Sequence, residues 1–222
     1  MRATLSFVLL AFAWIQAACA APFAVRIGEM RIALDAPPGF SDTQFTGSPR
    51  LNDIAASLTS ASNRILLFAL EDADLRRFTL GDPIELRRYL LIATPRAMEM
   101  QSLSLNAFAA LVAASLPQEG GPGAAPQDLK AYFDAQPPGR LNAIGTLKSD
   151  PERASMLFGT RLPPSRDEEP TRYLVSSRTL LLMRGKPLDI LVFSRYERPA
   201  DLEWVRGATE RWIEELRRLN SR

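Results

Sequence analysis

The segment YLVSSRTLLLMRGKPLDILVFSRY, residues 173–196, determines the fold class of this chain. Two apolar runs, Tyr173–Met183 and Leu188–Tyr196, flank the short segment RGKP at 184–187, where glycine and proline are typical of a turn. We therefore expect a long antiparallel hairpin. Its TLLLM and ILVF stretches are apolar without alternation, which places them in the middle of the predicted sheet.

An amphipathic helix is predicted directly after this hairpin, from Pro199 to about Asn220. At about 100° per residue, one sector of this helix is apolar and holds Trp204, Val205, Ala208, Trp212, Leu216 and Leu219. The opposite sector is charged and holds Arg206, Glu210, Glu214, Arg217 and Arg218. The expected i,i+4 ion pairs are Arg206–Glu210, Arg211–Glu215 and Glu214–Arg218. Both tryptophans are expected to pack against the sheet.

Strands and helices are also predicted upstream of the hairpin. Alternating apolar residues predict a β-hairpin over residues 23–34, and Ser48 followed by Pro49 marks the start of a short helix. Further strands are expected at 65–70, 89–93, 141–147 and 156–162, and further helices at 104–116 and 128–135. Gly145 and Gly159 count against the two later strands, because glycine weakens a strand interior.

The segment Glu71–Asp82 lies between two apolar strands and is expected to be a polar connection in which Leu75, Phe78 and Leu80 pack locally. Together the elements predict an α+β fold: a mainly antiparallel sheet flanked by helices, with a long C-terminal amphipathic helix. We expect a single domain over residues 21–222 with a flexible loop at 117–126, where glycine and proline are frequent.

The first twenty residues have the order of parts of a bacterial signal peptide. Arg2 is followed by the uncharged apolar run Leu5–Ile15 and then by small residues. Ala18 and Ala20 stand where a signal peptidase reads an A-x-A site, so we expect cleavage before Ala21. The sequence therefore predicts a periplasmic protein with no stable membrane span in the mature chain.

Two other outcomes remain open for this segment. An uncleaved N-terminus could tether the protein to the membrane, since no charge occurs between Arg2 and Arg26. A lipoprotein signal would instead lipidate Cys19, but such signals carry an aliphatic residue at the position that Gln16 occupies here.

Composition excludes several classes of chemistry. The chain has no histidine, and its one cysteine lies in the predicted signal peptide, so histidine- or thiol-dependent catalysis and soft-metal sites are ruled out. Residues 1–20 hold one of the 27 basic residues and none of the 25 acidic ones, which leaves a net charge of about +1 and no electrostatic signature of nucleic-acid binding. The sequence predicts no catalytic residue, no cofactor-binding residue and no metal ligand.

Charged clusters are the remaining candidates for chemistry. Glu71, Asp72 and Asp74 form the densest carboxylate group and could act as acid and base or bind calcium, although an ordinary charged turn explains them equally. Asp167, Glu168 and Glu169 are interpreted as solvated loop residues.

Basic residues offer two more candidates. A serine with a lysine base would need Lys130, Lys148 or Lys186, but no S-x-x-K spacing occurs, and solvated lysines are the simpler interpretation. Paired arginines could bind a carboxylate or phosphate, at Arg76 and Arg77, Arg87 and Arg88, or Arg217 and Arg218. Adjacent strand residues point to opposite faces, so Arg87 and Arg88 are not expected to form one fork.

The order of elements resembles PsbP-like and DcrB-like domains. The resemblance is carried by an N-terminal strand ending in LDAPPGF, the strand RILLFAL, a central helix, the hairpin at 173–196 and the terminal helix WVRGATERWIEELRRL. It implies a sandwich in which helices cover both faces of an antiparallel sheet and the last helix crosses it. It also implies an accessory or binding role in the cell envelope, and it assigns no functional residue.

Three functions follow from these observations. The first is a non-enzymatic periplasmic accessory protein whose partner is an envelope protein or a small ligand. The second is a small-molecule or lipid carrier with a pocket between the sheet and a helix. The third is a carboxylate-dependent hydrolase, which requires two acidic side chains facing each other across a cleft.

The predicted processing can be tested on protein recovered from the envelope of the bacterium that makes it. We expect an intact mass that begins at Ala21, because signal peptidase removes the first twenty residues. A mass that retains residues 1–20, or one that begins at a lipidated Cys19, would contradict this prediction and show a membrane-tethered protein.

Overall fold

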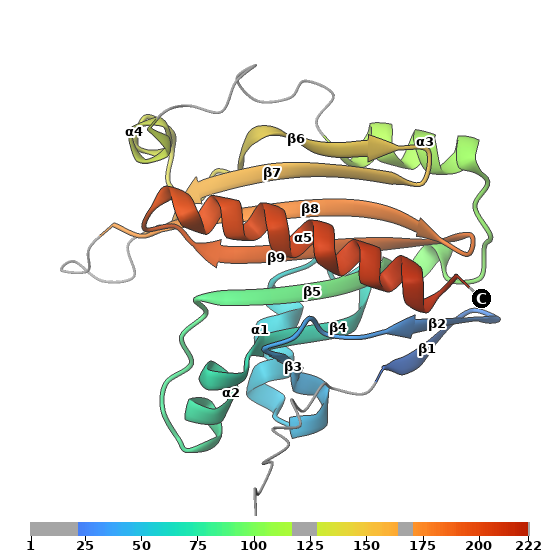
Figure 1. Cartoon of the computed structure of the whole chain (residues 1–222), viewed down its shortest axis with the longest axis horizontal. Helices are drawn as coiled ribbons and strands as arrows, with labels where there is room; N and C mark the ends of the chain where they lie inside the picture. Colours follow the sequence, from blue (N-terminus) through green and yellow to red (C-terminus); the bar gives the residue numbers. More distant parts are fainter. Residues whose placement is uncertain (1–21, 117–127, 164–170, 222) are drawn as a thin grey trace, which may run out of the picture.

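A seven-stranded antiparallel sheet forms the centre of the computed structural model, which describes residues 22–116, 128–163 and 171–221 (Figure 1). In sheet order, the strands are β3 (Phe40–Asp42), β4 (Asn63–Glu71), β5 (Arg88–Pro95), β9 (Lys186–Arg195), β8 (Tyr173–Met183), β7 (Arg153–Arg161) and β6 (Asn142–Asp150). A separate two-stranded sheet consists of β1 (Phe23–Ile27) and β2 (Met30–Leu34). The predicted α+β class and antiparallel sheet are confirmed.

The predicted signal peptide, the loop predicted at 117–126 and the acidic residues Asp167, Glu168 and Glu169 lie outside the described residues. They therefore stay predictions.

The central hairpin β8–β9 is confirmed, but its turn is shorter than predicted. Met183 pairs with Lys186, so only Arg184 and Gly185 form the turn, and Pro187 belongs to β9. Both turn residues have positive φ, 52° and 78°. This is the backbone that a two-residue hairpin turn requires to match the twist of its strands.

Helix α5 (Pro199–Leu219) covers one face of the sheet and crosses β8 and β9 (Figure 1). The side chain of Trp212, on the inner face of this helix, is fully buried, and its indole N–H donates to the backbone oxygen of Asp35 at 2.7 Å. The Asn220 side chain hydrogen-bonds both the N–H and the C=O of Ala33, at 2.9 and 2.8 Å. The end of α5 thereby holds β2 in place. Trp204, in contrast, stays half-buried against Phe40.

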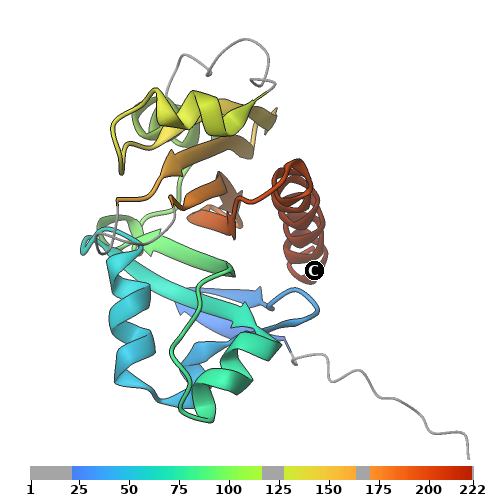
Figure 2. The ribbon, with the colours of Figure 1, turned by 90° about the vertical axis from the view of Figure 1, so that its left-hand side faces the viewer.

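The opposite face is covered by three helices: α1 (Pro49–Ser57), α2 (Asp72–Thr79) and α3 (Leu105–Ser115). Figure 2 shows α1 on one side of the sheet and α5 on the other. Helix α4 (Leu129–Asp134) lies on the α5 side, where Phe133 joins the same core. Two short 3₁₀ helices, η1 (Thr43–Thr46) and η2 (Arg96–Met98), follow β3 and β5.

Two sequence predictions are wrong in this part of the fold. The segment expected as a polar connection after Glu71 forms helix α2, because Leu75 and Phe78 pack onto the sheet. Leu80 does not pack locally, since its side chain is 79% exposed.

The three predicted i,i+4 ion pairs of α5 are not formed among the described residues. Arg206 pairs instead with Glu203, and Arg218 with Glu215, both one residue closer along the helix. Glu210 turns away from Arg206 because the buried Arg153 of β7 offers it a bidentate partner, with N–O distances of 2.7 and 3.0 Å.

Arg153 anchors a polar network beneath α5. Its side chain is only 1% exposed, and its Nε donates to Ser155 Oγ at 2.8 Å. Ser155 and Thr179 share a further hydrogen bond of 2.7 Å. The hydrogen bond from Arg153 holds the pKa of the Glu210 carboxyl below its usual value. A buried arginine is stable only with such partners, so this network fixes where α5 lies on the sheet.

Gly159 has a packing reason to be glycine. A Cβ at this position would lie 2.1 Å from Cζ of Phe133, whose side chain is completely buried. At Gly145, on the neighbouring strand β6, an added Cβ would meet nothing within 4 Å. The strands that these glycines made doubtful both form, at 142–150 and 153–161.

We expect Gly159→Ala to lower the free energy of unfolding by about 1–3 kcal/mol, because the added methyl overpacks the core. In a Phe133→Leu background the same change should destabilise less, since the atoms it meets are gone. Urea unfolding followed by tryptophan fluorescence measures all four proteins, and Gly145→Ala is the matched control with little expected effect. An equal loss in both backgrounds would contradict this explanation.

Candidate functional site

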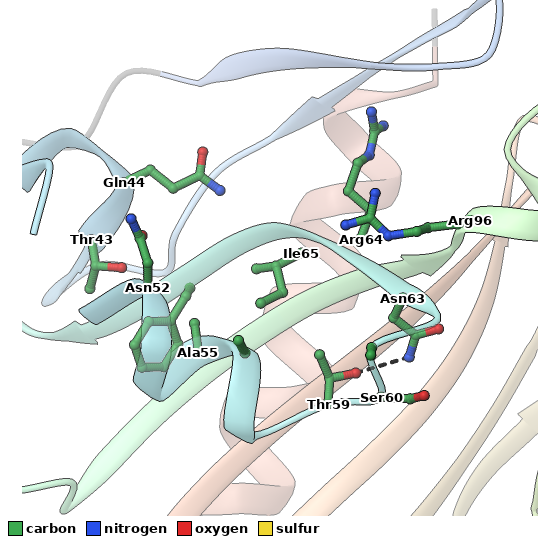
Figure 3. Close-up of a pocket in the computed structure, with 13 residues that line it drawn as sticks. Thr43, Gln44, Asn52, Ala55, Thr59, Ser60, Asn63, Arg64, Ile65 and Arg96 are labelled. Atoms are coloured by element: carbon green, nitrogen blue, oxygen red, sulfur yellow. Dashed lines mark hydrogen bonds between the residues drawn. The ribbon is translucent and has the colours of Figure 1, made fainter. Parts of the chain in front are cut away.

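A pocket of about 340 Å³ lies between α1 and the first half of β4 (Figure 3). Its apolar floor is formed by Ala55, Ile65 and Phe68. Polar side chains surround this floor: Gln44, Asn52, Thr59, Asn63, Arg64 and Arg96. The volume is near the lower end of the range for small-molecule sites.

Local sequence signals position the helical wall. Ser48 caps α1 by accepting from the backbone N–H of Leu51, and Pro49 occupies the first helical position. Leu51 and Ala55 then face the sheet and are buried against it. Since Ala55 has a small side chain, the helix leaves space above β4. After the helix ends, Thr59 Oγ1 accepts from the Asn63 side chain at 2.9 Å and ties the loop to the strand.

The pocket opens at an edge of the sheet. Strand β3 pairs with β4 only as far as Asp42 opposite Ala69, so within the described chain the first half of β4 has no strand on that side. Gln44 Nε2 donates there to the backbone oxygen of Leu66 at 3.3 Å. The pairing of β4 with β5 shifts register at Leu66, which bends the strand at the pocket.

Two arginines make this pocket electropositive. Arg64 Nε lies 3.3 Å from Glu99 Oε1, and its Nη2 donates to the backbone oxygen of Arg26 at 2.6 Å. The Arg96 side chain makes neither an ion pair nor a hydrogen bond with the part of the chain that the structure describes. No carboxylate is among the described residues that line the pocket.

Asp42 lies behind the polar wall, at the start of η1. Its Oδ1 accepts from the backbone N–H of Gln44 at 3.1 Å, but its Oδ2 is buried without a hydrogen-bond partner. Burial raises the pKa of the Asp42 carboxyl, and the hydrogen bond from the backbone N–H of Gln44 offsets part of this rise.

The carboxylate cluster predicted from the sequence does not converge on one site. Glu71 lies 3.7 Å from Arg88, and burial raises its pKa. Asp72 accepts from Ser41 Oγ at 2.7 Å. Asp74 is buried and pairs with Arg77 at 2.5 Å. Among the described residues, no group of three or more acidic, histidine or cysteine side chains could hold a metal.

The adjacent arginines do not form anion-binding forks in the described structure, because the members of each pair either have different partners or are exposed. Arg88 stacks on the Trp204 ring, with its guanidinium carbon 4.4 Å from the ring centre, while Arg87 is exposed. Arg217 pairs with Asp150. The other members behave in the same way, with Arg77 bound to Asp74, Arg218 to Glu215 and Arg76 exposed.

Lys186 is buried, so the prediction that the lysines are solvated is wrong for this residue. It is 5% exposed, and its ammonium donates to the backbone oxygens of Glu99 and Gln101, at 2.9 and 2.6 Å. These contacts join the segment after β5 to the β8–β9 turn. Lys148 lies 4.0 Å from Glu210 and belongs to the ion-pair network of α5.

Comparisons with known proteins give no information on function. The chain matches no family model, no curated protein and no solved structure. Within residues 22–116, 128–163 and 171–221, no helix combines the length and apolarity needed to cross a bilayer.

Asp42→Asn should show how the buried carboxyl affects stability. A raised folded-state pKa means that the carboxyl favours the folded state below the ordinary aspartate value of about 4 and loses that contribution as pH rises. Asparagine does not titrate, so the free energy of unfolding of the variant should increase relative to wild type from about pH 4 to neutral pH. Urea unfolding at several pH values measures this difference. Asp53→Asn, on the exposed side of α1, is the control; a difference that does not change with pH would refute the prediction.

Proposed function

We propose that this chain is an exported, non-enzymatic binding protein of the bacterial cell envelope that holds a small molecule in the α1–β4 pocket. The observation that carries the proposal is the lining of that pocket, where hydrogen-bonding side chains and two arginines surround an apolar floor. Ligand sites combine these features, because apolar surface supplies affinity and a few polar groups fix orientation.

The residue types at the pocket support binding over catalysis. Thr59 and Ser60 supply hydroxyl groups, but neither a lysine nor a carboxylate is among the lining residues to act as their base. The chain also has no histidine. A carboxylate-dependent hydrolase receives no support from Glu71, Asp72 and Asp74, because their partners draw them apart.

Export is proposed on the order of charged, apolar and small residues in the first twenty positions. The resemblance to PsbP-like and DcrB-like domains remains part of the proposal and agrees with an accessory role in the envelope.

A lipid carrier is a weaker alternative. The space between the sheet and α5 is occupied by a continuous core that includes Ile190, Val192, Val205 and Trp212. The polar rim of the α1–β4 pocket would leave amide and guanidinium groups facing an acyl chain, which is unfavourable. The lining therefore favours a polar ligand.

Native mass spectrometry on protein isolated from its own bacterial envelope tests the proposal. We expect wild-type protein to carry the added mass of a small molecule. Ala56→Trp should lack that mass, because residue 56 lines the pocket and a tryptophan would fill it. Ala109→Trp places the same side chain at an exposed position on α3 and should retain the ligand. A bare wild-type protein, or a ligand retained by Ala56→Trp, would overturn the proposed site.

A further inference from the structure

We propose that the α1–β4 pocket recognises a monocarboxylate, with the Arg96 guanidinium as its ionic partner and the Gln44 and Asn52 amides as hydrogen-bond partners for an uncharged polar group. This inference rests on the proposed function and specifies the chemistry of its ligand. An acylated amino acid and the C-terminal residue of a short peptide share that chemistry.

Arg96 is held at the pocket with its charge available. It directly follows β5, and its backbone N–H donates to the backbone oxygen of Ser62 at 3.0 Å, which fixes the residue at the rim. Figure 3 shows Arg96 and Arg64 together at one end of the pocket. A guanidinium with free N–H groups pairs with a carboxylate through two parallel hydrogen bonds. Nothing in the described chain competes for the Arg96 side chain.

The charge around Arg96 suits a single negative charge. Glu99 neutralises much of the Arg64 charge at 3.3 Å, so this end of the pocket carries about one positive charge that is not compensated. The C-terminal end of α1 leads into the lining residues Thr59 and Ser60, and a helix C-terminus carries partial negative charge. A dianionic phosphate would be repelled by that partial charge, and one uncompensated arginine would balance only half of its own charge. A carboxylate carries a single negative charge, which one arginine balances.

The rest of the pocket suits an uncharged polar group attached to a short apolar side chain. Gln44 uses its Nε2 on the backbone of Leu66, which leaves its Oε1 as an acceptor, and Asn52 offers both a donor and an acceptor. Ala55 and Ile65 supply apolar contact on the floor between these amides and the arginines (Figure 3). A secondary amide next to a carboxylate fits this arrangement.

N-acetyl-leucine is a suitable probe, and N-acetyl-leucinamide is its neutral counterpart. Titrations of the folded full-length chain, followed by the NMR signals of the Asn52 and Gln44 side-chain amides, measure binding of both. We expect N-acetyl-leucine to shift these signals and to bind at least about tenfold more tightly than the neutral amide, because only the acid pairs with Arg96.

Two variants separate the role of Arg96 from general charge. Arg96→Gln removes the guanidinium at an exposed position whose side chain makes neither a hydrogen bond nor an ion pair within the described structure, so the fold should be unaffected. It should weaken N-acetyl-leucine by about tenfold or more and leave the neutral amide unchanged. Arg211→Gln removes an exposed arginine of α5 and should change the affinity for neither probe.

An N-acetylated tripeptide ending in leucine distinguishes an acylated amino acid from the end of a peptide as the natural ligand. Tighter binding of the tripeptide than of N-acetyl-leucine indicates a peptide end.

Absence of binding by N-acetyl-leucine, equal binding of acid and neutral amide, or an unchanged affinity in Arg96→Gln would each overturn the carboxylate site. The proposed function fails separately. If native mass spectrometry finds a small molecule in the pocket while these probes do not bind, the binding protein stands and only its ligand chemistry is wrong.

Discussion

Strands β8 and β9 bury side chains on both of their faces, and this constraint determines the architecture. Val192 and Ile190 face α5, whereas Leu191 and Phe193 face the opposite helices. A sheet that is apolar on both sides is stable only when both sides are covered. Helix α5 supplies one cover and α1–α3 the other. Because α1 is short and lies at one end of β4, its cover is incomplete there, and the pocket occupies the remaining space.

Polar contacts between α5 and strands β7 and β8 determine how the helix lies on this apolar surface. Hydrophobic packing alone is non-directional and would tolerate small shifts of the helix. The bidentate pair between Arg153 and Glu210 opposes such shifts, because a shift would leave the guanidinium buried without its partner. Ser177 and Thr209 add a hydrogen bond of 2.5 Å between β8 and the helix. The same position of α5 brings Asn220 to β2, where it hydrogen-bonds Ala33. The N-terminal hairpin therefore also depends on the polar contacts that position α5.

Periodicity and capping signals were sufficient to predict the central hairpin, α5, the start of α1 at Ser48 and the antiparallel sheet. Helix α2 was missed because half of its residues are charged and no side chain caps it at Glu71. The helix forms through tertiary packing of Leu75 and Phe78. The pocket could not be predicted. Arg64 and Arg96 are far apart in the sequence, neither belongs to a motif, and only the pairing of β4 with β5 brings them together. The adjacent arginines at 76–77, 87–88 and 217–218 do not act as pairs, because Arg77, Arg88, Arg217 and Arg218 each contact a different residue of the fold.

An unpaired strand edge favours aggregation, because its free backbone groups can pair with another chain. Here the short η1 helix reduces that hazard, since Gln44 occupies the backbone oxygen of Leu66 and the register shift at that residue distorts the edge. Gln44 also lines the pocket, so edge protection and the proposed site share one side chain. The segment is stabilised imperfectly: Asp42, which starts η1, keeps a buried oxygen without a partner. Buried polar groups that lack a partner often mark functional sites. This one lies beside the proposed binding pocket, at the edge formed by β4.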